Sequence, residues 1–397
     1  MRKLIVIGLL AGMITTARGA EQLSVAQLEQ KLAASLKHDA GGGSDHAQTD
    51  PFKELDADIS TLPTADEGSA LAKQLYGVEL TERLTAKTFD RLLANYQLGL
   101  DSQWALVYLQ DRSEFLDSPQ SEWPSLAAPD TEAQKHTLEL ARGYVFHTLL
   151  RLPDFFATRK TTRFVSDTQT WDALGVPNRE GPHLAGSSAL EITFRDGKEF
   201  VTAPETMGMK RIPVDAGLAS QGEFGPELAI VLVDLADQAN GTIAFHHWET
   251  TAEGPAAVYR YSVAAAGSHY QVKFACAANT AFHASPGYHG SIAISPSTGA
   301  VLRMTLAADS KPGDPITHVT SAIDYGRVTI GDRVYICPLR SIASMTVEAN
   351  ACGRHGNAKR LAEPETMLNR TTFSDYHRLG STINILPPEK ADQQGSK

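Results

Sequence analysis

The second half of the chain alternates apolar and polar residues over long stretches, and this period of two constrains its fold more than any other feature. Residues 190–195 alternate strictly, and Asp196-Gly197 then turns the chain into residues 198–203, a pattern typical of a β-hairpin. Similar alternation predicts further strands at 242–249, 256–264, 269–276, 290–295, 300–308, 317–330, 333–347 and 370–386.

Short, turn-like links join these strands, among them Pro296–Gly299 and Gly331-Asp332. Strands joined in this way pair antiparallel, because parallel neighbours need long crossover connections. One buried helix interrupts the series, with Pro226 in its first turn and Asn240-Gly241 at its end. We therefore predict an α+β fold in which residues 158–387 form a large curved antiparallel β-sheet, half-barrel-like, with one buried helix.

The first part of the chain, residues 20–157, instead shows the 3.6-residue spacing of amphipathic helices and predicts an N-terminal helical domain. A long helix is expected from about Asp130 until Pro153 stops it. A glycine-rich stretch at about 38–51 predicts a flexible linker within this domain. The polar residues 388–397 are expected to form a disordered tail.

Residues 1–19 have the pattern of a secretory signal peptide. Arg2-Lys3 precede an apolar run at 4–14, and Ala17-Arg18-Gly19 offers a small-x-small cleavage site. We therefore expect an exported protein, either periplasmic or extracellular. The apolar run is shorter than the roughly 18 residues that a membrane-spanning helix needs, and no later stretch reaches that length, so no transmembrane segment is predicted.

Removal of this signal peptide would take away Arg2, Lys3 and Arg18 and change the formal net charge from −10 to −13. Such an acidic chain argues against a nucleic-acid partner, because binding phosphates requires clustered lysine and arginine. The same charge disfavours adhesion to anionic lipid headgroups.

An oxidising compartment would allow the three cysteines of the chain to form one disulfide. Cys337 and Cys352 close the shortest loop and are the disulfide candidates, although all three pairings stay open. Cys276 lies in an alternating stretch and is expected to point inward as a small hydrophobic residue. No sequence context suggests a catalytic thiol.

Recognisable catalytic or nucleotide-binding motifs are absent from the sequence, which leans against an enzyme without excluding one, and no cofactor is predicted. The most suggestive polar group is Phe245–Glu249, where alternation would place His247 and Glu249 on one face with Phe245, and His246 opposite. Together with His283 and His289 these residues could supply metal ligands. The alternative is a half-exposed strand whose imidazoles bond to neighbouring groups.

Several segments resemble a family of uncharacterised secreted bacterial proteins. The similar segments are Ala70–Leu75, Glu79–Leu84, Leu152–Arg159, Tyr288–Ile294, Tyr335–Pro338 and Ile383–Pro387. The resemblance implies no activity, substrate or catalytic residue. A more distant likeness, at the level of the expected architecture alone, is to the periplasmic lipoprotein-carrier half-barrels, which hold acyl chains or peptides in an apolar concavity.

We expect a non-enzymatic binding protein that holds a lipid, an acyl chain or a peptide in an apolar cleft of the curved sheet. The candidate lining residues are Phe245, Tyr261, Val272, Phe274, Ile292, Ile294 and Ile336. Two alternatives remain: a metal-dependent hydrolase that uses the candidate ligands named above, and an envelope assembly component whose helical domain docks a protein partner. An open hydrophobic cavity would favour carriage, and converging imidazoles would favour catalysis.

Overall fold

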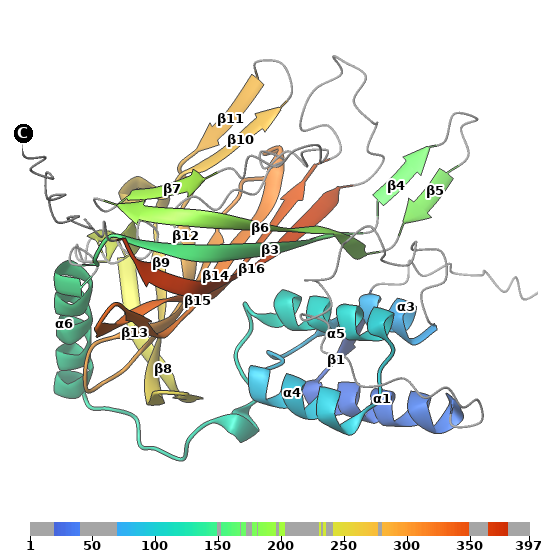
Figure 1. Ribbon diagram of the computed structural model, residues 1–397, viewed down its shortest axis with the longest axis horizontal. Helices are drawn as coiled ribbons and strands as arrows, with labels where there is room; N and C mark the ends of the chain where they lie inside the picture. The colour runs from blue at the N-terminus through green and yellow to red at the C-terminus, as the bar shows by residue number, and fades with distance from the viewer. Residues whose placement is uncertain are drawn as a thin grey trace, which may run out of the picture.

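The computed structural model describes residues 20–39, 70–148, 152–166, 168–171, 177–180, 182–195, 198–202, 230–231, 233–235, 241–276, 280–348 and 364–379. Helices and one large antiparallel sheet make up this part of the chain (Figure 1). The α+β class expected from the change of period is confirmed. The expected signal peptide and the polar tail lie outside the described residues, as does the expected linker at 38–51 except for residues 38–39, which are helical.

The N-terminal helices form one group, which lies below the sheet in Figure 1. Its helices are α1 (Val25–Asp39), α3 (Ala70–Tyr76), α4 (Ala86–Asn95) and α5 (Leu100–Ser113), followed by the short 3-10 helix η3 (Gln120–Glu122). Two short parallel strands, β1 (Glu21–Leu23) and β2 (Val78–Leu80), join it. Helix α5 is central, because residues 102–111 are all buried, and a helix buried on every side lies within a core.

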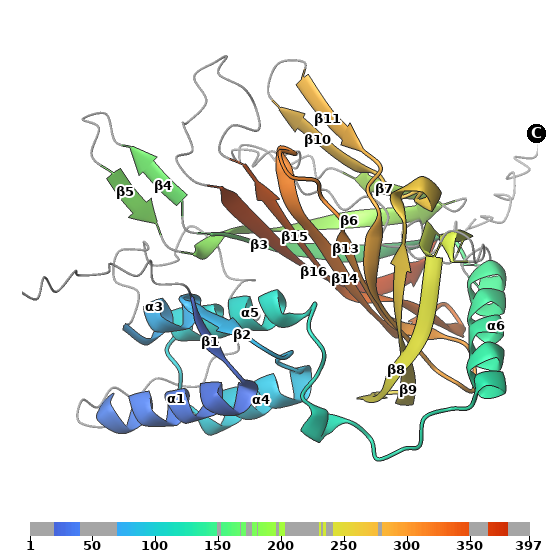
Figure 2. The same cartoon turned by 180° about the vertical axis from the view of Figure 1, so that it is seen from behind.

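The large sheet has ten strands in the order β7-β6-β3-β16-β15-β14-β13-β12-β9-β8. Their bounds are β3 (Phe155–Val165), β6 (His183–Arg195), β7 (Lys198–Thr202), β8 (Gly241–Thr251), β9 (Gly254–Val263), β12 (Tyr288–Ile294), β13 (Val301–Ala308), β14 (Ile316–Ile330), β15 (Arg333–Val347) and β16 (Glu365–Arg378). Every neighbouring pair is antiparallel, both where a short link joins the two strands and where the strands are distant in sequence, as β3 and β16 are. The sheet twists strongly from β6 to β8 and, among the described strands, does not close into a barrel (Figures 1 and 2).

Two further hairpins project from the sheet: β4 (Thr168–Trp171) with β5 (Pro177–Glu180), and β10 (Val272–Cys276) with β11 (Thr280–Ala284) (Figure 2). The predicted hairpin at 190–203 is confirmed as β6–β7. The strand expected at 269–276 is not part of the sheet, because β10 pairs with β11 while β9 pairs directly with β12. The strand expected at 370–386 begins earlier, at Glu365.

The helical group and the remaining helix, α6 (Thr131–Thr148), cover opposite faces of the sheet. Neighbouring residues of a strand point to opposite faces. Ala322 of β14 packs with the helical group, whereas the next residue, Ile323, packs with Ala141 and Val145 of α6. Although α6 precedes the sheet in sequence, it therefore packs as part of the sheet's core. We call the two sides the helical-group face and the α6 face.

The predicted buried helix at 226–240 is described only at residues 230–231 and 233–235, which are helical up to residue 234. Val231 and Leu235 are buried on the α6 face. Asp234 is buried among them and accepts hydrogen bonds from the hydroxyl of Tyr288 (2.7 Å) and from the backbone N–H of His269 (3.0 Å). A buried carboxylate that has such donors can stay within an apolar core.

The turn at Pro296–Gly299 brings the sheet into direct contact with α6. Gly299 has a positive φ of 72°, and a β-carbon at this position would lie 2.3 Å from the carbonyl carbon of Leu140 in α6. Only glycine has both the conformation and the size for this position. The turn can therefore approach α6 this closely only because residue 299 is a glycine, which has a hydrogen atom where other residues have a β-carbon.

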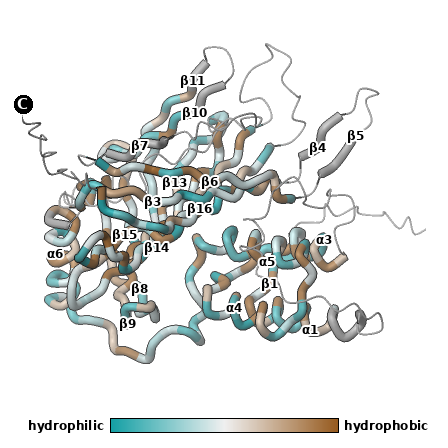
Figure 3. The backbone as a smooth tube through the Cα atoms, in the orientation of Figure 1, coloured by the Kyte–Doolittle hydropathy of each residue, from teal (hydrophilic) through white to brown (hydrophobic). Residues whose placement is uncertain are grey.

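Hydrophobic and hydrophilic residues follow one another at short intervals along the strands and helices (Figure 3). No helix among the described residues is long and apolar enough to cross a bilayer.

Candidate functional site

A cavity of about 710 Å³ lies on the helical-group face, between the loops that flank α5 and the β8 end of the sheet. The lining residues come from the helical group (Thr81, Glu82, Phe115, Leu116, Asp117, Ser118, Gln120 and Trp123) and from the sheet (His246, Arg260, Tyr261, His289, Gly290, Ser291 and Thr305). Both aromatic rings and hydrogen-bonding groups line it. Its volume is within the range of roughly 300–1,000 Å³ that is usual for small-molecule sites.

A β-bulge on β8 brings two histidines to this side of the sheet. Phe245 pairs with Tyr259 and His247 pairs with Val258, so His246 is an extra residue in the strand. A bulge of this kind redirects the side chains around it. The Nδ1 atoms of His246 and His247 lie 2.6 Å apart, so one ring donates its N–H to the other.

This bulge corrects the arrangement expected from alternation, in which His247 would share a face with Phe245 and His246 would lie opposite. Phe245 instead packs on the α6 face, where its ring meets that of Trp248 at 5.6 Å. Both histidines contact Trp123 of the opposing loop: its indole stacks on the His247 ring with centroids 4.1 Å apart and meets the His246 ring edge-on at 5.9 Å. The two imidazoles therefore converge where a regular strand would separate them.

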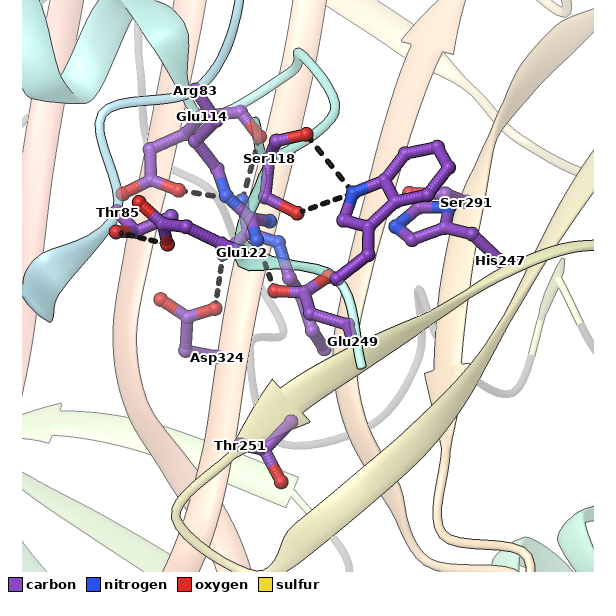
Figure 4. A network of polar contacts seen from close by, with 12 residues as sticks. Arg83, Thr85, Glu114, Ser118, Glu122, His247, Glu249, Thr251, Ser291 and Asp324 are labelled. Carbon is purple, nitrogen blue, oxygen red and sulfur yellow. Dashed lines mark hydrogen bonds and ion pairs between the residues drawn. The ribbon is translucent and has the colours of Figure 1, made fainter. Parts of the chain in front are cut away.

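The loop that carries Trp123 is held at several points. The indole N–H donates to the backbone carbonyl of Ser118 at 3.0 Å (Figure 4 shows Ser118 and His247). The carboxylate of Glu122 accepts hydrogen bonds from Thr85 (2.9 Å) and Thr88 (2.8 Å), at the N-terminal end of α4. A carboxylate is stabilised at this end of a helix by the helix dipole. Trp123 is therefore placed by the start of α4 as well as by its own loop.

Asp117 lies on the same loop and faces β9. Its backbone carbonyl accepts the N–H of Arg83 at 2.8 Å, and its carboxylate forms an ion pair with Arg260. One ligand atom each of Asp117, His246 and His247 lie within 4.8 Å of one another. Among the described residues, no other group of three or more His, Cys, Asp or Glu side chains lies close enough together to hold a metal ion.

Burial controls the charge of His247. His247 is only 4% exposed. Its pKa is lowered to about 4, mainly by this burial and to a smaller extent by the neighbouring His246. The ring is therefore neutral at neutral pH. Its Nε2 atom has no hydrogen-bond partner among the described residues.

Beside the cavity, a buried network of charges joins the helical group to the sheet (Figure 4). Glu114, at the end of α5, accepts a hydrogen bond from Arg303 at 2.5 Å and one from Arg340. Both arginines also pair with Asp324, so that β13, β14 and β15 each contribute one charged side chain. Separately, Arg83 of the helical group pairs with Glu249 of β8.

The arginines determine the charge state of this network. Burial alone would raise the pKa of Glu114 and Asp324, but Arg303 and Arg340 outweigh it and hold the pKa of both carboxyls below the usual range. Asp111 behaves differently, because burial raises its pKa to about 6. Arg370, whose guanidinium nitrogen lies 2.6 Å from the carboxylate oxygen, lowers the pKa but does not offset the effect of burial. The network therefore keeps one fully buried carboxylate, Glu114, and one partly buried carboxylate, Asp324, ionised at neutral pH.

Strands β9, β12 and β13 approach one another closely at residues that line the cavity. The hydroxyl of Tyr261 on β9 reaches across β12 and donates to the backbone carbonyl of Thr305 on β13 at 2.6 Å. It passes Gly290, where a β-carbon would lie 1.9 Å from that carbonyl oxygen. Ser291 donates its backbone N–H to the hydroxyl of Thr305 at 2.9 Å.

Most of the expected cleft residues lie in the sheet's core, away from the cavity. Ile292 and Ile294 are fully buried on the α6 face, with Phe245 and Ile336 packed around the same cluster, and Val272 belongs to a separate buried cluster. Tyr261 contributes both to this core and to the cavity. The side chain of Phe274 lies outside the described residues.

The four metal ligands expected from the sequence do not come together. His247 meets Asp117 and His246, whereas Glu249 pairs with Arg83. His289 lines the cavity and pairs with Asp309 at 2.8 Å, and His283 is exposed on β11.

The disulfide candidate Cys337 is a free, fully buried thiol whose pKa burial raises to about 12. Cys352 and the side chain of Cys276 lie outside the described residues.

Sequence reasoning did not find Asp117, Trp123 or the buried network. One feature of the sequence does indicate the network: three predicted apolar strands each contain a charged residue, and the charges alternate in sign along the chain, at Arg303, Asp324 and Arg340. They become neighbours only through the strand register, in which Arg303 lies opposite Asp324 and Asp324 opposite Arg340.

Comparison with known proteins assigns no family to the chain. No protein-family model matches it, and no curated protein matches it. Among solved structures, a DUF1329 family protein from Desulfovibrio piger is similar over 62% of this chain and 92% of its own, with 7% sequence identity and a TM-score of 0.26. This likeness is too low to support a conclusion about fold or function.

Proposed function

We propose that the chain is a non-enzymatic binding protein, exported from the cytoplasm, whose ligand is a short peptide or a similar amide-bearing molecule. The observation that carries this proposal is the cavity between the helical group and the sheet, with its mixed lining. Of the three occupants considered from the sequence, a peptide matches this lining best.

The chemistry of the walls distinguishes among these occupants. An acyl chain would leave the side-chain amide of Gln120 without a partner where it covered it, and a buried polar group without a partner costs about 1–3 kcal/mol. It would also offer no hydrogen bond to the side chains of Ser291 and Arg260. A peptide supplies N–H and C=O groups for these side chains. Its apolar side chains can pack against Trp123 and Phe115.

The position of the cavity also favours binding over a purely structural role. Its walls belong to the helical group and to the sheet, which share one apolar core, and the charges of Glu114, Arg303 and Arg340 join these two parts further beside the cavity. A preformed site of this kind loses little entropy when it binds a ligand.

The test combines native mass spectrometry with fluorescence. Protein purified from its own cells without denaturant is expected to carry an additional mass of a peptide-like compound. In solution, a mixture of unmodified tripeptides is expected to change the tryptophan emission, and palmitate is not. Trp123→Ala, measured by calorimetry because this variant lacks the indole at the cavity, should weaken peptide binding by at least about tenfold, since it removes an aromatic ring from the lining.

The matched control is Trp248→Ala, since the indole of Trp248 donates to Ala127 and packs with Phe245 outside the cavity lining. This variant should bind tripeptides as the wild type does. Binding of palmitate without tripeptides would overturn the proposed ligand. The absence of both a co-purified compound and a fluorescence response would overturn the binding function.

A further inference from the structure

The histidine pair on the β8 bulge has a donor set that the peptide-binding function does not use. His246 and His247 are consecutive, yet their Nδ1 atoms are 2.6 Å apart, and Asp117 approaches them from the opposite wall. One ligand atom of each of these three residues therefore lies within 4.8 Å of the other two.

A second observation points to a ligand at this place. His247 is 96% buried, and its ring lies between Trp123 and His246 with Nε2 unpaired among the described residues. A buried polar atom of this kind usually bonds to an ordered water or an ion. With Nδ1 facing His246 and available to an ion, Nε2 would carry the proton and would take a water as its partner.

We propose that Asp117, His246 and His247 form a binding site for one divalent transition-metal ion of the Zn²⁺ type at the edge of the cavity. Imidazole nitrogen and carboxylate oxygen are the ligands that such ions prefer, and a site with three protein ligands leaves a coordination position open. The open position would face the cavity, which Asp117 and His246 also line.

The geometry requires only small movements of side chains. Two nitrogens bound at roughly 2.0–2.1 Å to a tetrahedral ion lie about 3.3 Å apart, so the two rings would separate by roughly 0.7 Å from their present distance. Metal binding would replace the hydrogen bond between the rings. The backbone of the loop stays held by the hydrogen bond from Arg83 to Asp117.

Arg260 competes with the ion for the carboxylate of Asp117. The side chain of Arg260 is 56% exposed, and an ion pair with such exposure contributes little stability. A divalent ion can therefore displace the guanidinium, which has room to turn towards solvent. Glu249 does not compete as a ligand, because it is held by Arg83.

The experiment uses metal-free full-length protein titrated with ZnCl₂ and monitored by calorimetry. We expect one Zn²⁺ per chain. His246→Ala and Asp117→Asn should each weaken binding by at least about tenfold, as loss of a ligand does in known metal sites. Arg260→Gln should strengthen binding by up to about fivefold, because the carboxylate then loses its competitor.

His289→Ala is the matched control, since His289 also lines the cavity but pairs with Asp309 away from the cluster. It should leave Zn²⁺ affinity unchanged. Equal affinity in the wild type, His246→Ala and Asp117→Asn would overturn the proposal, as would a loss of binding in His289→Ala as large as that in His246→Ala. Replacement of Zn²⁺ by Co²⁺ should give the visible absorption of a nitrogen- and oxygen-ligated ion in the wild type and in His289→Ala, but not in His246→Ala.

The metal site and the peptide-binding function can fail separately. Zn²⁺ is titrated without any organic ligand, and tripeptide binding is measured in the presence of a chelator. Tripeptide binding without Zn²⁺ binding would remove the metal site alone, and Zn²⁺ binding without tripeptide binding would remove the proposed ligand alone.

Discussion

Gly290 shows how much a single residue can decide at the floor of the cavity. Its lack of a side chain lets Tyr261 reach over β12 to the carbonyl of Thr305. The reason is space rather than backbone conformation, since Gly290 does not have a positive φ.

We predict that Gly290→Ala destabilises the protein by about 3 kcal/mol or more, because the new β-carbon meets backbone that cannot turn away. Urea denaturation measures the effect. Gly143→Ala is the control: Gly143 lies within α6 with no atom of the described residues within 4 Å of the added carbon, so this change should stabilise the protein by about 0.5–1 kcal/mol. Equal stability of Gly290→Ala and wild type would show that the sheet has more room than its register implies.

The residue scale is also where sequence reasoning failed most clearly. Alternation correctly marked 242–249 as a strand and drew attention to its histidines, but it cannot show a bulge. Because His246 is an extra residue in β8, each side chain after it points to the opposite face of the sheet from the one that alternation predicts. His247 therefore lies against Trp123 and not on the face of Phe245. The partners Asp117 and Trp123 are more than a hundred residues away in the sequence, in a loop that has no periodic pattern.

At the scale of elements, the contact between α6 and the turn after β12 connects helix and sheet through backbone alone. A β-carbon on Gly299 would lie 2.3 Å from α6, and φ at this position is 72°. Helix α6 covers the residues Ile292 and Ile294 that the sequence suggested as a ligand cleft. Their alternation predicted a buried face correctly, but apolar character alone does not reveal whether a ligand or a helix covers it.

We predict that Gly299→Ala loosens α6 and lowers the free energy of unfolding by about 3 kcal/mol, the sum of backbone strain and a steric clash. Hydrogen exchange should show faster exchange in residues 131–148. Gly254→Ala separates the two causes, because Gly254 has φ of 104° but no atom of the described residues within 4 Å of the added carbon. It should cost about 1–2 kcal/mol and leave exchange in α6 unchanged. An equal cost for both variants would argue that the contact with α6 contributes nothing.

At the scale of the whole molecule, the buried network fixes the helical group onto the sheet. Because burying a charge is costly, removing one partner of a buried ion pair destabilises a protein more than replacing both partners with apolar residues. Glu114 and Asp324 depend on Arg303 and Arg340 for their ionised state.

We predict that Arg340→Met destabilises the protein by about 3–5 kcal/mol at pH 7, because it leaves buried carboxylates short of a counter-charge. In the wild type these two groups have lowered pKa values, so their contribution is complete above pH 4.5 and is lost as the pH falls below that. In the variant their pKa values rise, so acidification neutralises them and the difference from wild type should shrink between pH 7 and pH 5.

Urea denaturation at several pH values measures this difference. Arg327→Met is the control, since its pair with Glu253 is exposed and should cost less than about 1 kcal/mol at every pH. A difference between Arg340→Met and wild type that stayed constant with pH would show that the carboxylates do not need Arg340 to remain charged.

The order of strands has a consequence for how the molecule is made. β16, the last described strand, lies between β3 and β15 and pairs with both. Strands β3, β6 and β7 are synthesised long before β16, yet they connect to the rest of the sheet only through it. Such distant pairings are slow to form, because the intervening chain must first be closed into a loop. The sheet therefore cannot be completed before β16 has been synthesised, and a chain truncated before residue 365 would keep its two halves of the sheet apart.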